Sequence, residues 1–169
     1  MIRNQINHIL DSLPEEELEN VLWALEHIQS RYLIKWNLFG KGVKITNLFE
    51  QSQKLIELWD ESFTYDVSEE TKQNIHYNEF KWHVFSYEVL DCLKDEAARA
   101  AFDNVMKDEI YVMYQGSPYV MLYSNANELI AADFDTEQDI YLFDKSFSWT
   151  YINTHESMCG PYFKKSIKK

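Results

Sequence analysis

Residues 109–125, EIYVMYQGSPYVMLYSN, decide the fold of this chain. Two runs rich in Tyr, Val and Met flank the turn residues GSP (116–118), and this pattern predicts a β-hairpin. A second pair of runs follows in DIYLFD (139–144) and FSWTYIN (147–153), with only two residues between them. The C-terminal half of the chain therefore predicts a mainly antiparallel sheet.

The last of these runs has an aromatic alternation. Phe147, Trp149 and Tyr151 alternate with Ser148 and Thr150. Because successive side chains of a strand point to opposite faces, we expect the three aromatic rings to share one face, buried against helices.

The first hundred residues follow the helical period instead. Apolar residues recur every three or four positions in three segments, residues 2–10, 18–32 and 48–63. Ser68 is a good N-cap for a shorter helix, and DEAARAAFDNVMK (95–107) has the composition of a helix. The segment EFKWHVFSYEVLDCL (79–93) is ambiguous up to Ser86 and predicts a helix beyond it.

Helices first and strands later predict an α+β domain. We expect an N-terminal helical extension over residues 1–40, which the glycine-containing stretch FGKGVKI (39–45) ends. An α+β core over residues 43–163 and a basic tail over residues 164–169 complete the predicted organisation.

The 169-residue chain contains no apolar run of 18 residues and no signal-peptide pattern at its start. The sequence therefore predicts a cytoplasmic protein without a membrane partner. Its two cysteines, Cys92 and Cys159, are expected to be reduced thiols there. Cys92 falls in the predicted helix after Ser86, where a cysteine is typically a small buried hydrophobe.

The formal charge is −12, and it is concentrated in one region. Residues 86–144 contain thirteen acidic and three basic residues. Nucleic-acid affinity rests on basic side chains, so no nucleic-acid partner is expected. The acidic region either keeps the protein soluble or faces a basic protein partner, as an inhibitor of the immunity type masks a toxin. Independently, the N-terminal helices could pack between two copies of the chain and form a homodimer.

Four stretches in this order resemble a family of small uncharacterised bacterial proteins, known only as a domain of unknown function. They are WDESF (59–63), WHVFSYEVLDCL (82–93), DIYLFDKSFSWTYINTHE (139–156) and CGPYF (159–163). The resemblance covers roughly residues 43–163 and implies no activity, substrate or catalytic residue.

The stretch THESMC (154–159) has the densest grouping of reactive residue types. His155 and Cys159 stand four residues apart with Glu156 between them, and both side chains can bind Zn²⁺. They would share one face only in a helix, which Gly160 and Pro161 limit to one turn. The alternative is that His155 and Glu156 form hydrogen bonds at a strand-to-turn corner.

A thiol enzyme would pair Cys159 with His155 or His83, because a nucleophilic cysteine needs a neighbouring base. Glu156 or Asp144 could orient His83 in such a site. A cleft that joins His83 to residues 155–159 is therefore the predicted site, and an inert thiol beside structural histidines is the alternative.

The acidic stretch DFDTEQDIYLFD (133–144) imitates a calcium loop, but it has Gln138 where the loop requires glycine. An acidic turn that leads into a strand accounts for it better. The chain has neither a phosphate loop nor a Gly-x-Ser-x-Gly elbow, and we expect no cofactor.

Overall fold

The computed structural model describes residues 2–166, except for the side chains of residues 27, 30 and 31. The chain divides into two compact units, Met1–Asn37 and Leu38–Lys169.

The first unit is helical, as the sequence predicts. It contains α1 (Ile2–Ser12) and most of α2 (Glu15–Gly40). Three glutamates occupy the first turn of α2, where negative charge is favourable at the positive end of the helix dipole. The helix ends at Gly40, and Gly42 follows with a φ of +79°, a conformation that suits glycine.

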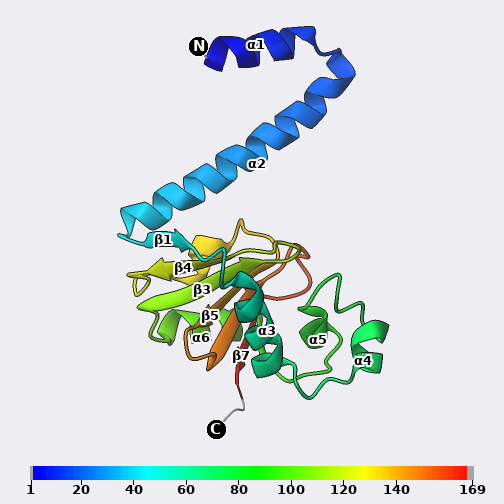
Figure 1. Ribbon diagram of the computed structural model, residues 1–169, viewed down its shortest axis with the longest axis vertical. Coiled ribbons are helices and arrows are strands. Elements are labelled where there is room, and N and C mark those ends of the chain that lie inside the picture. The colour runs from blue at the N-terminus through cyan, green and yellow to red at the C-terminus, as the bar shows by residue number, and fades with distance from the viewer. Residues whose placement is uncertain (1, 167–169) are drawn as a thin grey trace. The chain divides into compact units, whose positions relative to one another are not determined.

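The second unit contains a seven-stranded sheet in which every neighbouring pair is antiparallel. Its strands are β1 (Lys44–Asn47), β2 (Leu93–Lys94), β3 (Glu109–Tyr114), β4 (Val120–Ser124), β5 (Ile140–Asp144), β6 (Trp149–Asn153) and β7 (Tyr162–Lys165). Their order is β1-β4-β3-β5-β6-β7-β2 (Figure 1). The predicted α+β class is confirmed.

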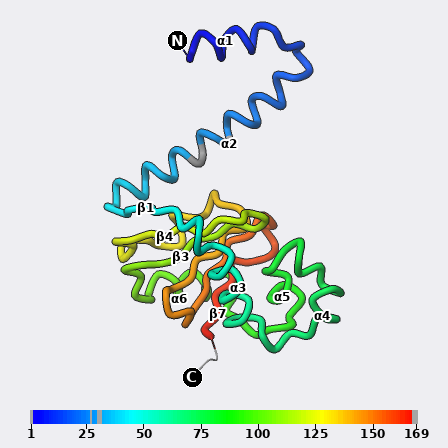
Figure 2. The backbone as a smooth tube through the Cα atoms, viewed as in Figure 1, coloured from blue at the N-terminus to red at the C-terminus, as the bar shows by residue number. Residues whose placement is uncertain are grey.

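Both predicted hairpins are present. In the β3–β4 pair Val112 lies opposite Met121, and in the β5–β6 pair Leu142 lies opposite Tyr151. Figure 2 shows the path of the backbone from β3 to β7. These five strands form the middle of the sheet, with β1 at one edge and β2 at the other. The β3–β4 and β5–β6 hairpins have short connections, so local sequence was enough to predict them.

Helices cover both faces of the sheet. They are α3 (Ser52–Phe63), α4 (Glu69–Asn74), α5 (His83–Ser86), α6 (Asp95–Asn104) and the 3-10 turn η1 (Ala131–Phe134). On one face, Trp59 of α3 donates a hydrogen bond from Nε1 to Thr150 Oγ1 at 3.0 Å. On the other face, the ring of Phe102 in α6 stacks on Tyr151 with centroids 4.5 Å apart.

The aromatic alternation is correct for Trp149 and Tyr151 and wrong for Phe147. Trp149 and Tyr151 are buried beside Phe102. Phe147 has a φ of +54° in the turn before β6, and its ring contacts Phe143 on the α3 side of the sheet. The strand therefore begins two residues after the start of the sequence pattern.

The helix predicted beyond Ser86 is also wrong. The chain turns at Glu88, whose φ is +57°, and the Leu90 N–H donates to the carbonyl oxygen of Val84. Cys92 thus lies outside any helix, directly before β2. At the other end, β7 continues to Lys165, and Lys164, the first residue of the predicted basic tail, is buried in this strand.

Candidate functional site

Asp139 is the centre of the predicted site region. Its carboxylate accepts hydrogen bonds from Trp82 Nε1 at 2.9 Å and from the His155 backbone N–H at 3.2 Å. His155 Nδ1 lies 2.8 Å from Asp139 Oδ2. Asp139 has a φ of +51°, which aspartate tolerates better than most residues. One carboxylate therefore connects the start of β5, the segment before α5 and the corner after β6.

The carboxylate of Asp139 defines the proton position on His155. A carboxylate only accepts hydrogen bonds, so Nδ1 of His155 carries the proton. The other ring nitrogen, Nε2, is the one nearer to Glu156. The distance from Nε2 to Glu156 Oε1 is 3.9 Å. The His155 side chain is 32% exposed, so part of the ring is open to solvent.

His83 lies in the same aromatic cluster as His155. The rings of Phe80 and Trp82 contact both histidines, with centroid separations of 4.5–5.8 Å. His83 Nδ1 donates to the Ile75 carbonyl oxygen at 2.6 Å, so neither Glu156 nor Asp144 orients this ring. The two histidines are therefore close to the same pair of rings, but each has its own hydrogen-bond acceptor.

A polar hollow of about 340 Å³ lies beside His155. Residues from two loops line it, among them Glu137, Asn153, Glu156 and Ser157. Glu137 is only 6% exposed, and its carboxylate accepts a hydrogen bond from the hydroxyl of Tyr114. The wall of this hollow therefore consists mainly of hydrogen-bond acceptors and a histidine, and it suits a polar ligand better than an apolar one.

Cys159 does not form a reactive pair with His155. Residues 155–159 are turn and bend, so the one-turn helix that would align these two side chains is absent. Thr154 Oγ1 instead donates to the carbonyl oxygens of Glu156 and Cys159, which fixes the corner. Burial and the neighbouring Glu156 raise the pKa of the Cys159 thiol, and this disfavours the nucleophilic thiolate.

The carboxylates of the calcium-like stretch also have separate partners. Asp133 pairs with Lys41 at 2.6 Å, Asp135 with Arg99 at 2.5 Å, and Asp139 with His155. Among the residues that the structure describes, no group of three His, Cys, Asp or Glu side chains is arranged to hold a metal ion.

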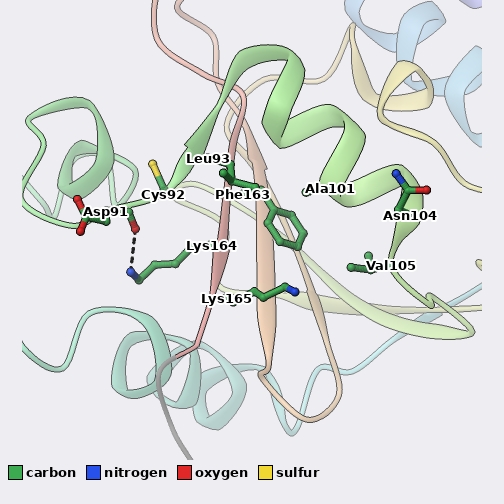
Figure 3. Close-up of a pocket in the computed structure, with 9 residues that line it drawn as sticks. All are labelled: Asp91, Cys92, Leu93, Ala101, Asn104, Val105, Phe163, Lys164 and Lys165. Atoms are coloured by element: carbon green, nitrogen blue, oxygen red, sulfur yellow. Dashed lines mark hydrogen bonds between the residues drawn. The ribbon is translucent and has the colours of Figure 1, made fainter.

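A second hollow, of about 640 Å³, lies between α6 and the strands β2 and β7. Figure 3 shows Phe163 and Lys165 among the residues that line it, together with the hydrogen bond from Lys164 Nζ to the carbonyl oxygen of Asp91, which is 2.9 Å long. Cys92 lies on its rim. Burial raises the pKa of this thiol to about 11, so it is protonated at neutral pH.

The acidic region has its own surface, formed by two loops that lie side by side. We call residues 103–108 and 125–135 the acidic loop pair. Asp103 accepts from the Ala131 N–H at 2.7 Å, and the Ala126 N–H donates to the carbonyl oxygen of Asp108 at 3.0 Å. The exposed side chain of Met106 belongs to the same loops, with 88% of its surface accessible.

Lys107 is the one basic residue of the acidic loop pair, and it is buried. It is 1% exposed, and its Nζ donates to the carbonyl oxygens of Phe102, Asp103 and Val105 at 2.8–3.1 Å. Its charge therefore stabilises the carboxyl end of α6 and is not presented to solvent. Among the described side chains, no basic group forms an ion pair with Asp103, Asp108 or Glu128.

Sequence reasoning missed Asp139 as the partner of His155. The signal was available in the second hairpin, because Ile140 lies opposite Asn153. That register places Asp139 next to Thr154 and His155. The burial of Lys107 had no comparable local signal.

Residues 32–163 match a family described as a domain of unknown function, DUF4275. The chain belongs to the DUF4275 family. The match confirms the resemblance seen in the sequence, and it begins before the predicted residue 43, within α2. The DUF4275 region contains both the Asp139 cluster and the acidic loop pair, and the family description names no activity.

No curated protein and no solved structure matches the chain. Within residues 2–166, none of the helices has the length and apolar character needed to cross a membrane.

Proposed function

We propose that this protein is an interaction module that binds a basic protein partner through the acidic loop pair. The observation that carries the proposal is the burial of Lys107. Asp133 and Asp135 already have cationic partners. Because Lys107 is satisfied internally, the carboxylates of Asp108 and Glu128 are left to attract positive charge from outside. An inhibitor or immunity-type protein that masks a basic surface would use such a site.

The composition of the acidic loop pair supports a protein partner. Asp108 and Glu128 are exposed carboxylates, and the exposed Met106 and Ile130 add apolar contact area. Charge complementarity speeds the encounter of two proteins, whereas apolar contacts in the centre of an interface supply most of the affinity. A surface for solubility alone would need the charges but not the apolar side chains.

Charge reversal tests the proposal. The full chain carrying Asp108→Lys and Glu128→Lys is compared with a control carrying Glu57→Lys and Glu61→Lys, two exposed carboxylates on α3. Each protein is used to capture partners from the native cytoplasm, the predicted location. We expect the unmodified protein and the control to retain one stoichiometric basic protein that the loop variant loses. Equal capture by the loop variant and the control, or no stoichiometric partner, would overturn the proposal.

A second function, acid–base chemistry at His155, is favoured by one specific observation. Asp139 binds Nδ1 of His155, which leaves Nε2 without this anchor, and His155 lines the polar hollow. A carboxylate that holds Nδ1 of a histidine is the usual way to prepare Nε2 for accepting a proton. Glu156 would line the approach to His155, since both residues border the polar hollow.

Ligand binding at His155 can be measured without knowing the reaction. The imidazole resonances of His155 are followed by NMR while a library of small polar metabolites is added. A ligand that shifts them in the unmodified protein, and not in a folded His155→Gln variant, supports this second function. If no compound shifts them, or if His155→Gln unfolds the domain, the histidine is a structural brace.

A further inference from the structure

The helix α2 carries an apolar stripe with the spacing of a coiled coil. Its positions alternate by four and three residues: Leu18, Leu22, Leu25, Gln29, Tyr32, Trp36 and Phe39. The large side chains from Leu22 onwards are 45–66% exposed. A 26-residue helix gains little stability from its own propensity, so such a stripe needs a covering surface.

The two halves of the stripe differ in side-chain size. The half before Gln29 contains only leucines, and the half after it contains only aromatic residues. In a parallel pair of helices, leucine would face leucine and aromatic would face aromatic, so three bulky layers would be adjacent. In an antiparallel pair centred on Gln29, Leu22 would face Trp36, and the leucine half of one helix would lie along the aromatic half of the other. Pairing small with large side chains in every layer fills a helix interface more evenly.

The charges of α2 favour the same direction. Residues 15–26 contain five glutamates and no basic residue, whereas residues 27–40 contain two basic residues and no acidic residue. This distribution also suits the dipole of a single helix. Between two copies, only the antiparallel arrangement places the acidic half beside the basic half, whereas a parallel pair would place ten glutamates together.

Gln29 lies at the centre of the stripe. In the antiparallel arrangement it would meet Gln29 of the second copy on the twofold axis. An amide is both donor and acceptor, so the two side chains can hydrogen-bond to each other, and a polar residue at such a position fixes the register of a coiled coil. We propose that the protein self-associates as an antiparallel homodimer through α2, centred on Gln29. This dimer is independent of the acidic loop pair.

Sedimentation equilibrium of the full chain tests the dimer. The expected mass is twice the chain mass of 20.2 kDa. Leu22→Glu and Trp36→Glu should each weaken dimerisation on the order of a hundredfold, because the dimer buries the new charge twice. Ala24→Glu is the matched control, since Ala24 lies on α2 outside the stripe and is exposed, and it should leave the mass unchanged. A monomer at every concentration, or a dimer that resists both stripe variants, would overturn the proposal.

Disulfide trapping tests the direction. When a Leu22→Cys chain is mixed with a Trp36→Cys chain and oxidised, the antiparallel dimer should give a Cys–Cys link between the two variants and none within either variant alone. The two positions are about 21 Å apart along one helix, far beyond disulfide reach. Peptide mass spectrometry separates this link from any that involve Cys92 or Cys159. Self-linking of the Leu22→Cys chain alone would show a parallel pair and contradict the proposal.

Discussion

Asp139 accepts hydrogen bonds from both the backbone N–H and Nδ1 of His155, so one carboxylate fixes the position and the ring orientation of this histidine. Trp82 donates to the same carboxylate and contacts His155 through its ring. The corner after β6 is therefore attached to the segment before α5 through Asp139. These hydrogen bonds to Asp139 hold the corner in place, which we call the Asp139 brace, whether or not Nε2 of His155 takes part in catalysis.

Replacement of Asp139 should therefore reveal the strength of the brace. Asp139→Ala removes the acceptor of three N–H groups and places alanine at a positive φ, so we expect a loss of about 2–4 kcal/mol in the free energy of unfolding. Asp139→Asn keeps one acceptor and tolerates the backbone conformation, so it should cost about half as much. Urea denaturation measures both values. Equal effects, or effects no larger than that of the exposed neighbour in Gln138→Ala, would contradict the brace.

Gly160 is the second requirement of this corner. Its φ is +100°, and an added Cβ would lie 3.2 Å from the Tyr162 ring and 3.3 Å from Thr154 Cγ2. Gly160→Ala should lower the unfolding free energy by about 1–3 kcal/mol, since both backbone strain and crowding oppose it. Gly116→Ala is the control, because Gly116 also has a positive φ but an added Cβ there meets nothing within 4 Å. If the two variants lose equal stability, crowding at the corner has no effect.

Lys107 should contribute more to stability than an exposed lysine. Lys107→Met leaves three carbonyl oxygens without their donor at the end of α6, and we expect a loss of about 2–3 kcal/mol. Lys145→Met removes an exposed lysine that pairs with Glu109 at the surface, and it should cost much less because solvent screens such pairs. Thermal unfolding of the two variants compares them. A Lys107→Met protein as stable as Lys145→Met would show that the buried cation is dispensable.

Both thiols should react slowly in the folded protein. Burial disfavours the charged thiolate, so the pKa of Cys92 rises to about 11 and that of Cys159 also rises. At pH 8, on the order of one Cys92 side chain in a thousand is then a thiolate, and the fraction grows as the pH increases towards the pKa. Iodoacetamide labelling, followed by peptide mass spectrometry, should be much slower in buffer than in urea. Rapid labelling of Cys159 in the folded protein at neutral pH would instead support a thiol enzyme.

Local sequence patterns predicted the parts of the fold that short-range contacts form. The β3–β4 and β5–β6 hairpins have four to five residues between their strands, and their alternation is visible in the chain. The strands β1, β2 and β7 were not predicted. Each is two to four residues long, and β1 and β2 pair with strands far away in the sequence. Too few residues alternate in such strands for a pattern to appear.

Errors arose where a single residue with positive φ redirects the chain. Glu88 ends the helical pattern that continues in the sequence, and Phe147 leaves the face that its alternation predicts. Neither residue type is typical of this conformation, so no local signal announces it. For the candidate site, His83 and His155 contact the same two rings, and the cleft that would join them stays a prediction. The sequence pattern assigned Asp139 to the calcium-like stretch and did not indicate its contact with His155.

The most direct test of the proposed interaction is the affinity of the purified basic partner for the protein at two ionic strengths. The account predicts binding that weakens by about tenfold or more between roughly 50 and 300 mM salt, and a similar loss in the Asp108→Lys, Glu128→Lys variant at low salt, with the α3 control unchanged. Binding that is insensitive both to salt and to charge reversal in the acidic loop pair would contradict it.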